Sequence, residues 1–411
     1  MKSPRCRFTR VFVLVLVLTL GSFSMGCNED EADSEVAVED SGSESDATES
    51  DASEPDTSDL DAEKPDADVE VPDADDADAA EPDAADVDAD PVEEGLTWET
   101  IQSEFAVGVN IAGFEFTGSE LPGTANTHYP VINPTILDYW IDNGVRQFRL
   151  PFKWERVQHE LEGELDEAYL GYIMAVVDYA GEQGARVILD MHNYGRRHGS
   201  TIGSDEVPIS AYRDVWSKLA QEFEGHPGVL GYDIMNEPHG LPGGSEQWVE
   251  MAQEAILGIR EHDTSTWLFI EGYSYSNGHR WQGQNPTIHT LSDSSDRIIW
   301  SPHQYFDENN TGTYAHSYDD ENAYEERGAD RINNFIEWME EHGFSRGHVG
   351  EYGVPDDDER WLELMDTFLA HLGEHGMLSS AWADGPWWAN YALKVGADRP
   401  QSAVIIEHAN N

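Results

Sequence analysis

The sequence predicts an α/β fold of the closed (β/α)8 type, the TIM barrel, over residues 95–411. Eight short runs rich in β-branched and aromatic residues indicate strands, at 106–111, 145–150, 186–191, 229–235, 267–271, 298–303, 348–351 and 379–383. Helical stretches lie between most of these runs, and several stop at glycine, as helix ends commonly do. Eight alternations over about 300 residues are the count for a closed barrel. An open doubly wound sheet is the alternative, but no glycine-rich phosphate loop follows the first run.

The spacing of apolar residues predicts the helices that separate these strands. They are expected at 134–143, 167–183, 211–224, 245–261, 332–341 and 359–374.

Residues 1–27 have the pattern of a signal peptide. Four basic residues precede an apolar run at 11–20 that is too short to span a bilayer comfortably. Cys27 follows the small residues Ser24 and Gly26, a pattern typical of bacterial lipoproteins, although Ser24 stands where leucine is usual. We expect lipidation at Cys27; the alternative is a plain secretory peptide with an incidental cysteine. Both alternatives place the mature protein outside the cell or on its surface.

Residues 28–94 form a linker of Asp, Glu, Ala, Ser, Pro and Val in which Lys64 is the only base. Such a segment buries too little apolar surface to offset its ordering entropy, so we expect it to be disordered. It would act as a spacer in front of the barrel domain. An acidic run that binds cations or a basic partner is the alternative.

The net charge of −59 excludes a nucleic-acid-binding protein, which would need a basic face. The only two cysteines, Cys6 and Cys27, lie in the first thirty residues. The barrel domain therefore has no disulfide and no cysteine metal site. We expect no metal and no cofactor.

Polar residues follow the predicted strands at the point where each one ends. Two of these tips carry glutamates. Glu237 lies between Asn236 and Pro238, and Glu351 lies with Tyr352 between two glycines. Strand ends in a barrel gather at one face, which is where barrel enzymes keep their active groups. Two carboxyl groups held together suggest glycoside cleavage, in which one carboxyl acts as acid and the other as base or nucleophile.

The sequence here resembles glycoside hydrolase family 5, the large retaining family that contains many cellulases. The resemblance rests on segments at the predicted strand ends, which are 148–151 (FRLP), 190–194 (DMHNY), 234–239 (IMNEPH), 303–305 (HQY) and 350–352 (GEY). Segments 108–114 (GVNIAGF) and 194–199 (YGRRHG) are most similar to endoglucanases of subfamily 5. The resemblance covers roughly residues 100–390 and implies a barrel fold, hydrolysis of β-1,4-glucan and no cofactor.

By this resemblance Glu237 would be the acid/base and Glu351 the nucleophile, with the two carboxyl groups about 5–5.5 Å apart. Arg149 beside Glu351 would lower the pKa of that carboxyl. The proton of Glu237 would be retained at working pH through a raised pKa. Asn236 would hydrogen-bond the 2-hydroxyl of the cleaved sugar.

Nine further residues would support the substrate or form outer subsites. Tyr305 would hold the nucleophile, and Trp382 would stack under the cleaved sugar. His192 and His303 would line that sugar's site, with Asn193 beside them; a satisfied core histidine, or barrel packing for Trp382, is the alternative. Outer subsites are expected at Tyr194, Trp154, Trp281 and His239.

Several neighbouring residues are expected to have other roles. Asp190 and Asp233 lie within strands and should be structural partners, while Trp387 and Trp388 should pack within a loop. Arg197 stands where the resemblance leads us to expect an aromatic, so one stacking platform should be lost.

The predicted function is a secreted or surface-anchored endo-β-1,4-glucanase, acting as a monomer on a β-1,4-glucan, with membrane contact only through the lipid. One alternative is a retaining enzyme of the same family that acts on mannan, xyloglucan or mixed-linkage glucan. A non-catalytic glycan-binding barrel is the other alternative.

Overall fold

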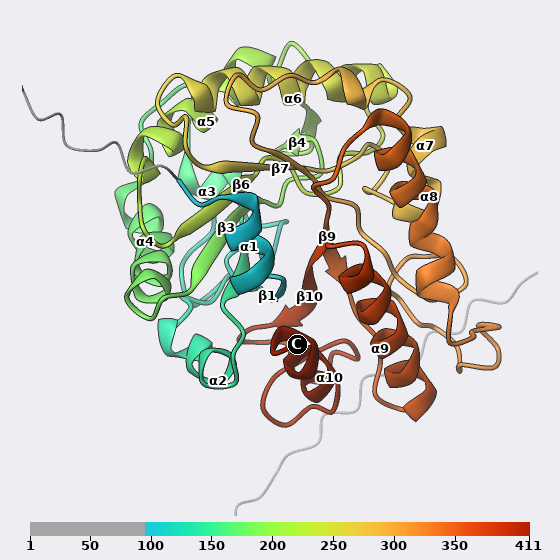
Figure 1. Ribbon diagram of the computed structural model, residues 1–411. Coiled ribbons are helices and arrows are strands. Elements are labelled where there is room, and N and C mark those ends of the chain that lie inside the picture. The colour runs from blue at the N-terminus through green and yellow to red at the C-terminus, as the bar shows by residue number, and fades with distance from the viewer. Residues whose placement is uncertain (1–94) are drawn as a thin grey trace, which may run out of the picture. The chain divides into compact units, whose positions relative to one another are not determined.

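The computed structural model describes residues 95–411, and the protein in this range is a (β/α)8 barrel, as predicted (Figure 1). The signal peptide 1–27, the lipidation candidate Cys27 and the linker 28–94 lie outside the described residues. Within residues 95–411, no helix is long and apolar enough to cross a membrane.

Eight parallel strands follow the order β8-β7-β6-β3-β2-β1-β10-β9. Two isolated parallel bridges, Trp300 to Gly347 and His303 to Glu351, connect β8 with β9 and close the ring. The strands are β1 (Val107–Ile111), β2 (Gln147–Phe152), β3 (Arg186–Met191), β6 (Val229–Asp233), β7 (Trp267–Ile270), β8 (Ile298–Trp300), β9 (His348–Tyr352) and β10 (Leu378–Asp384). A small antiparallel hairpin, β4 (Arg196–Arg197) and β5 (Ser200–Thr201), lies in the loop after β3.

Helices surround this ring on the outside (Figure 1). The longer ones are α4 (Glu167–Glu182), α5 (Ile209–Phe223), α6 (Gly244–Arg260), α8 (Arg327–His342), α9 (Glu359–Glu374) and α10 (Gln401–Ala409). The shorter ones are α1 (Trp98–Glu104), α2 (Asp138–Asp142), α3 (Trp154–Val157) and α7 (Trp281–Gln284), with 3-10 turns at Pro134–Leu137, Gly278–Arg280 and Ile288–Thr290.

Local sequence explains where several helices begin and end. Asp166 and Asp358 accept hydrogen bonds from the backbone N–H groups of Tyr169 and Arg360 and so cap α4 and α9. Gly343, with φ of 73°, ends α8 in the left-handed conformation that glycine adopts without steric cost.

The predicted strands agree with the observed ones to within three residues at each end. The runs 229–235 and 298–303 leave the sheet early, at Asp233 and Trp300, because the chain turns there toward the site. The tip after β6 stays attached, since Asn236 N–H donates to the Met191 carbonyl at 2.9 Å. Helices α1, α3, α7 and α10 were absent from the prediction.

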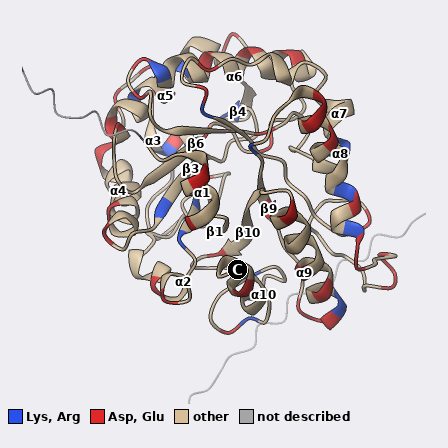
Figure 2. Ribbon diagram, in the orientation of Figure 1, with Lys and Arg blue, Asp and Glu red and all other residues tan. Residues whose placement is uncertain are grey.

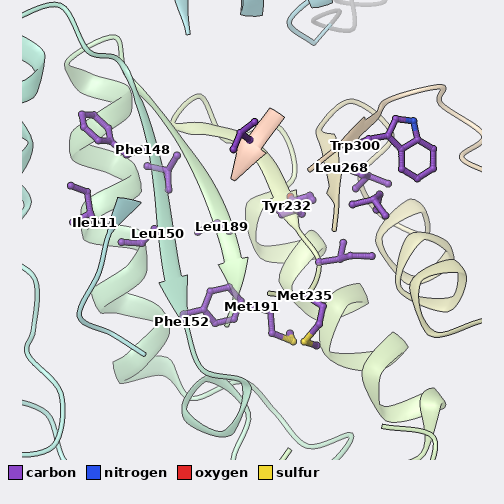
Figure 3. Packing of buried hydrophobic residues seen from close by; sticks show 14 of the residues in the cluster. Ile111, Phe148, Leu150, Phe152, Leu189, Met191, Tyr232, Met235, Leu268 and Trp300 are labelled. Carbon is purple, nitrogen blue, oxygen red and sulfur yellow. The ribbon is translucent and has the colours of Figure 1, made fainter. Parts of the chain in front are cut away.

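Side chains alternate between the two faces of the strands, as the two-residue period of a strand requires. On β2, Phe148, Leu150 and Phe152 belong to the large apolar core shared with the helices (Figure 3). Arg149 lies between them in sequence and faces the interior of the barrel, where it binds Asp233. The alternation therefore gives each strand an apolar outer face and an inner face free for other residues.

The inner face is divided along the barrel axis. At the amino end of the strands, Ile188, Leu230 and Phe269 pack in an apolar cluster against Ile101 and Phe105 at α1. Helix α1 therefore covers this end of the barrel (Figure 1). The functional groups are left to the carboxyl end of the strands.

Charge on the outer surface is mostly negative. Asp and Glu are spread over the outer helices, and Lys and Arg are fewer (Figure 2). This distribution fits the acidic composition read from the sequence.

Candidate active site

Two glutamates from distant parts of the chain meet at the carboxyl end of the barrel. Glu237 follows β6, and Glu351 lies in β9. His303, after β8, lies between them, with Nδ1 at 2.9 Å from Glu237 Oε1 and 3.6 Å from Glu351 Oε2. One ligand atom from each of these three side chains lies within 4.8 Å of the others. The structure therefore brings together the two carboxylates that the sequence paired.

The backbone at Glu237 has an unusual conformation. Its φ is 45°, in the left-handed region that few non-glycine residues occupy. Its backbone N–H donates to Glu271 Oε2 at 2.7 Å, which holds the turn in place. Such a strained backbone conformation persists where surrounding contacts hold it in place, and it is frequent at functional sites. The Glu237 side chain remains 18% exposed, so it faces the substrate side.

Glu351 is held more firmly and is almost buried. Arg149 Nη1 contacts its Oε1 at 3.0 Å, and the Tyr305 hydroxyl donates to its Oε2 at 2.9 Å. Arg149 does lower the pKa of Glu351, as expected, but the net shift of that pKa is upward. Burial raises the pKa of this carboxyl, and the positive charges of His303 and Arg149 only partly offset that rise.

Arg149 is fully buried and serves as the shared cation of the site. Its guanidinium contacts Asp190 at 3.0 Å, Asp233 at 2.8 Å, Glu271 at 2.9 Å and Glu351 at 3.0 Å. Burial works against its charge, but these carboxylates outweigh burial and raise the pKa of Arg149. Burial also raises the pKa values of Asp190 and Asp233 to about 6. Both aspartates contact Arg149, in keeping with the structural role expected for them.

Asn236 has one satisfied and one free amide atom. Its Oδ1 accepts from Arg149 Nη2 at 2.8 Å, whereas its Nδ2 is buried and has no partner in the protein. A buried donor without an acceptor is costly, so this atom is suited to a substrate oxygen.

His192 and Trp382 form a stacked pair beside the carboxylates. Their ring centroids are 5.5 Å apart with an interplanar angle of 15°. His192 Nδ1 lies 2.7 Å from Asp190 Oδ2, and its Nε2 lies 3.1 Å from the Tyr194 hydroxyl. Burial lowers the pKa of His192 well below its usual value, so the ring is neutral.

Metal ligands were not expected from the sequence. In residues 95–411, one group of three or more His and carboxylate side chains has its ligand atoms this close together, and it is Glu237, His303 and Glu351. Glu351 is already bound by Arg149 and Tyr305. These atoms are therefore committed to hydrogen bonds within the site.

Comparison with known proteins matches the family described as cellulase (glycosyl hydrolase family 5) to residues 107–389. The chain belongs to glycosyl hydrolase family 5. Among the similar proteins, endo-β-1,4-glucanase B of Emericella nidulans is 32% identical over 292 residues, which are 70% of this chain and 85% of the relative.

Solved family 5 structures share the fold. The endoglucanase Cel5A of Pseudomonas stutzeri is 43% identical with a TM-score of 0.71, over 74% of this chain and 94% of that one. The same enzyme in complex with cellobiose is 42% identical, with a TM-score of 0.71 over 74% of this chain and 93% of that one. An endo-β-1,4-glucanase of Xanthomonas axonopodis pv. citri is 29% identical with a TM-score of 0.69, over 74% and 98% of the two chains.

Two of the four outer-subsite expectations in this family 5 chain are wrong. Trp154 is fully buried beneath Tyr212, and its Nε1 donates to Gln158 at 3.0 Å. Trp281 is also fully buried, packed on Phe335 of α8. Both rings are core residues. The Trp154 ring packs against Tyr212 of α5 and the Trp281 ring against Phe335 of α8, so neither ring has a face open to a sugar.

Tyr194 and His239 do line a groove of about 260 Å³, and His239 Nδ1 lies 2.9 Å from the Glu237 carbonyl oxygen. Asn193 lines it as well, but its amide is fully engaged: Nδ2 donates to Glu155 and Oδ1 accepts from the Trp154 backbone. Asn193 therefore shapes the loop and supports the site from behind.

Arg197 does not open a gap where an aromatic was expected. Its guanidinium lies 5.5 Å from the Trp154 ring centroid, and Nη2 donates to the Gln158 and His159 carbonyls. The residue is turned inward and braces the loop after β3.

Sequence reasoning missed three residues of the site. Glu271 follows β7 and contacts Arg149 and the Glu237 backbone. Lys153 donates to the His192 carbonyl, and burial lowers the pKa of its amine. Tyr275 is 52% exposed and stacks on His239 at 4.0 Å. For Glu271 a signal was available, because it is itself the polar residue that ends the apolar run 267–270.

Proposed function

We propose that this family 5 endo-β-1,4-glucanase cleaves internal β-1,4-glucosidic bonds by double displacement, with Glu351 as nucleophile and Glu237 as acid/base. The observation that carries the proposal is the short separation of the two carboxylates, whose oxygen atoms come within 4.8 Å of each other. Retaining enzymes keep their carboxyl groups about 5–5.5 Å apart, whereas inverting enzymes need about 6.5–9.5 Å to admit a water.

In the first step, Glu351 attacks the anomeric carbon while Glu237 gives its proton to the leaving oxygen. The Tyr305 hydroxyl and Arg149 hold the Glu351 carboxylate by both oxygens, so its orientation is fixed before substrate arrives. The more exposed Glu237 reaches the glycosidic oxygen from the cleft side.

In the second step, Glu237 takes a proton from water, which attacks the glycosyl–enzyme bond and frees Glu351. His303 Nδ1, at 2.9 Å from Glu237 Oε1, is placed to accept or return a proton at that oxygen. The same glutamate thus serves as acid and then as base, as microscopic reversibility requires.

Two further groups support the cleaved sugar. The free Nδ2 of Asn236 is a donor for the sugar 2-hydroxyl, a contact that strengthens in the transition state. The Trp382 ring, held by stacking on His192, offers a flat apolar surface for the face of a β-glucosyl ring.

The substrate also bears on location. Because a glucan polymer does not cross a cell envelope, the enzyme acts outside the cell. Attachment through a lipid on Cys27, and action as a monomer without nucleic-acid partners, remain part of the proposal.

Activity on a panel of soluble β-glycans tests the substrate and the two roles together. We expect carboxymethylcellulose to give faster reducing-sugar release than mannan, xyloglucan or mixed-linkage glucan. Glu237→Ala and Glu351→Ala should each lower the rate by about 100-fold or more, because a positioned acid–base group contributes about 100–10,000-fold.

Glu254→Ala provides the matched control. Glu254 lies on α6 and pairs with Arg213 on the outer surface, so its loss should leave the rate unchanged. Preference for mannan would favour the alternative substrate. Unchanged turnover in both site variants would refute the roles of Glu237 and Glu351, and no turnover in the unmodified protein would leave only a binding barrel.

A further inference from the structure

A third glutamate lies behind the catalytic pair and has no part in the double displacement. Glu271 immediately follows β7 and is fully buried. Its backbone carbonyl accepts from Trp248 Nε1 at 2.8 Å, which fixes the strand end. A buried carboxylate is expensive unless it is paired, so its contacts should reveal what holds it there.

Both carboxylate oxygens of Glu271 face groups that contact Glu237 or the residues around it. Oε1 lies 2.9 Å from Arg149 Nη2 and 3.0 Å from His303 Nε2. Oε2 accepts from the backbone N–H of Glu237 at 2.7 Å. The His303 contact is electrostatic and not a hydrogen bond, because its N–H direction falls outside hydrogen-bond geometry. Glu271 is thus in contact with Glu237 along two routes, one through the backbone and one through His303.

The two routes have different consequences. The backbone contact holds Glu237 in its left-handed conformation, with φ of 45°. The imidazole route places His303 between two carboxylates, with Nε2 toward Glu271 and Nδ1 toward Glu237 Oε1. The partner on one ring nitrogen decides which tautomer the other nitrogen presents.

We propose that Glu271 is a positioning residue for the acid/base, which sets through His303 whether Glu237 holds its proton. This inference rests on the proposed role of Glu237. With Glu271 ionised and a proton on His303 Nε2, the Nδ1 lone pair faces Glu237 and favours its protonated form. Without the negative charge of Glu271, nothing holds the proton on Nε2, so Nδ1–H faces Glu237 and favours its ionised form. No proton passes between His303 and Glu271, because their contact lacks hydrogen-bond geometry.

The charged groups around Glu271 and His303 shift the pKa values of both side chains. Burial raises the pKa of Glu271 to about 8, while the positive charges of His303 and Arg149 oppose that rise. Burial lowers the pKa of His303, but the charges of Glu271 and Glu351 outweigh it and raise that pKa. Five charged or titratable groups face the pair, namely Arg149 of β2, Asp190 of β3, Asp233 of β6, Glu237 after β6 and Glu351 of β9.

Glutamine cannot replace Glu271, although it has the same shape. Both oxygens of Glu271 face donors that never lose their protons, the Arg149 guanidinium and the Glu237 backbone N–H. Either orientation of an amide therefore sets its NH2 group against one of these donors. Glu271→Gln therefore removes the negative charge that faces His303 Nε2.

The test measures kcat/KM on two substrates that differ in their need for an acid. Cellopentaose has a poor leaving group that must be protonated, whereas 2,4-dinitrophenyl β-cellobioside has a leaving group that departs without a proton. We expect Glu271→Gln to lower kcat/KM about 10- to 100-fold on cellopentaose and less than about threefold on the aryl cellobioside. The alkaline limb of the cellopentaose pH profile should move down by about half a pH unit or more.

Glu115→Gln is the matched control. Glu115 is another buried glutamate, whose Oε2 accepts from Gly113 N–H at 2.7 Å. It should leave the alkaline limb in place. If Glu271→Gln does not fold, Glu271→Asp carries the same test, since it keeps the charge but withdraws the oxygens from His303.

Equal losses on both substrates, with an unmoved alkaline limb, would show that Glu271 only supports the fold and would overturn the inference. No loss on cellopentaose would overturn it as well. Failure of the proposed function looks different, because the unmodified enzyme would then be inactive on both substrates.

Discussion

At the scale of single residues, the site is an excess of carboxylates around one guanidinium. Arg149 contacts four acidic side chains, and the His303 imidazole lies between three glutamates. Because burial disfavours charge, this set holds more protons than the same groups would in water. A site that must both give and take a proton benefits from groups that titrate near neutral pH.

Glu115 allows the cost of a buried carboxylate to be measured away from the reacting groups. Burial raises its pKa to about 7, while the backbone N–H of Gly113 partly opposes the rise. The folded state therefore binds a proton that the unfolded chain releases near its ordinary value of 4.5. The stability associated with this proton is fully present below pH 4.5 and is lost as pH rises toward about 7.

We expect Glu115→Gln to remove this loss. The free energy of unfolding, from urea titrations between pH 4.5 and 8, should fall less with rising pH in the variant than in the unmodified protein. The two curves should then run parallel above pH 8. Curves that stay parallel from pH 4.5 upward would show that Glu115 titrates normally in the folded protein.

At the scale of elements, the packing of helices on the barrel decides which aromatics can meet a sugar. Trp281 of α7 packs on Phe335 and Trp338 of α8, with centroids at 4.9 and 5.4 Å. Tyr275 lies in a run of three residues with positive φ, from Ser274 to Ser276, and is pushed outward. The two rings are close in sequence, yet one is core and the other is surface.

Trp281→Ala should therefore lower stability without altering substrate binding. Loss of a buried tryptophan costs about 3–5 kcal/mol of unfolding free energy, and KM for cellopentaose should stay the same. Tyr275→Ala should do the opposite, with stability unchanged within about 0.5 kcal/mol and a raised KM. Chemical denaturation of both variants measures their stability, and initial rates measure their KM. A raised KM in a folded Trp281→Ala variant would show that Trp281 does form a subsite.

The same elements show what could be predicted from the sequence. The strand tips bearing Glu237 and Glu351 were predictable, because a polar residue that ends an apolar run stands out locally. The exposure of Trp154 and Trp281 was not, since it depends on which helix packs on each ring. Glu271 also ends an apolar run, but its role could not be predicted, because its partners Arg149 and His303 come from other strands and meet it only when the ring closes.

At the scale of the whole molecule, the barrel separates stability from chemistry along one axis. Ile101 and Phe105 at α1 help fill the amino end of the ring, and the polar network occupies the carboxyl end. The count of eight strands predicted the closed ring, but not its seam between β8 and β9. That seam is where the His303–Glu351 bridge forms, so closure of the fold and assembly of the site coincide.

The central claim is that Glu237 and Glu351 are close enough for a covalent intermediate. Proton NMR during cellopentaose hydrolysis reports the anomer of the product before it mutarotates. The account predicts that the β-anomer appears first, because two displacements restore the original configuration. First appearance of the α-anomer would mean a single displacement by water and would contradict the account.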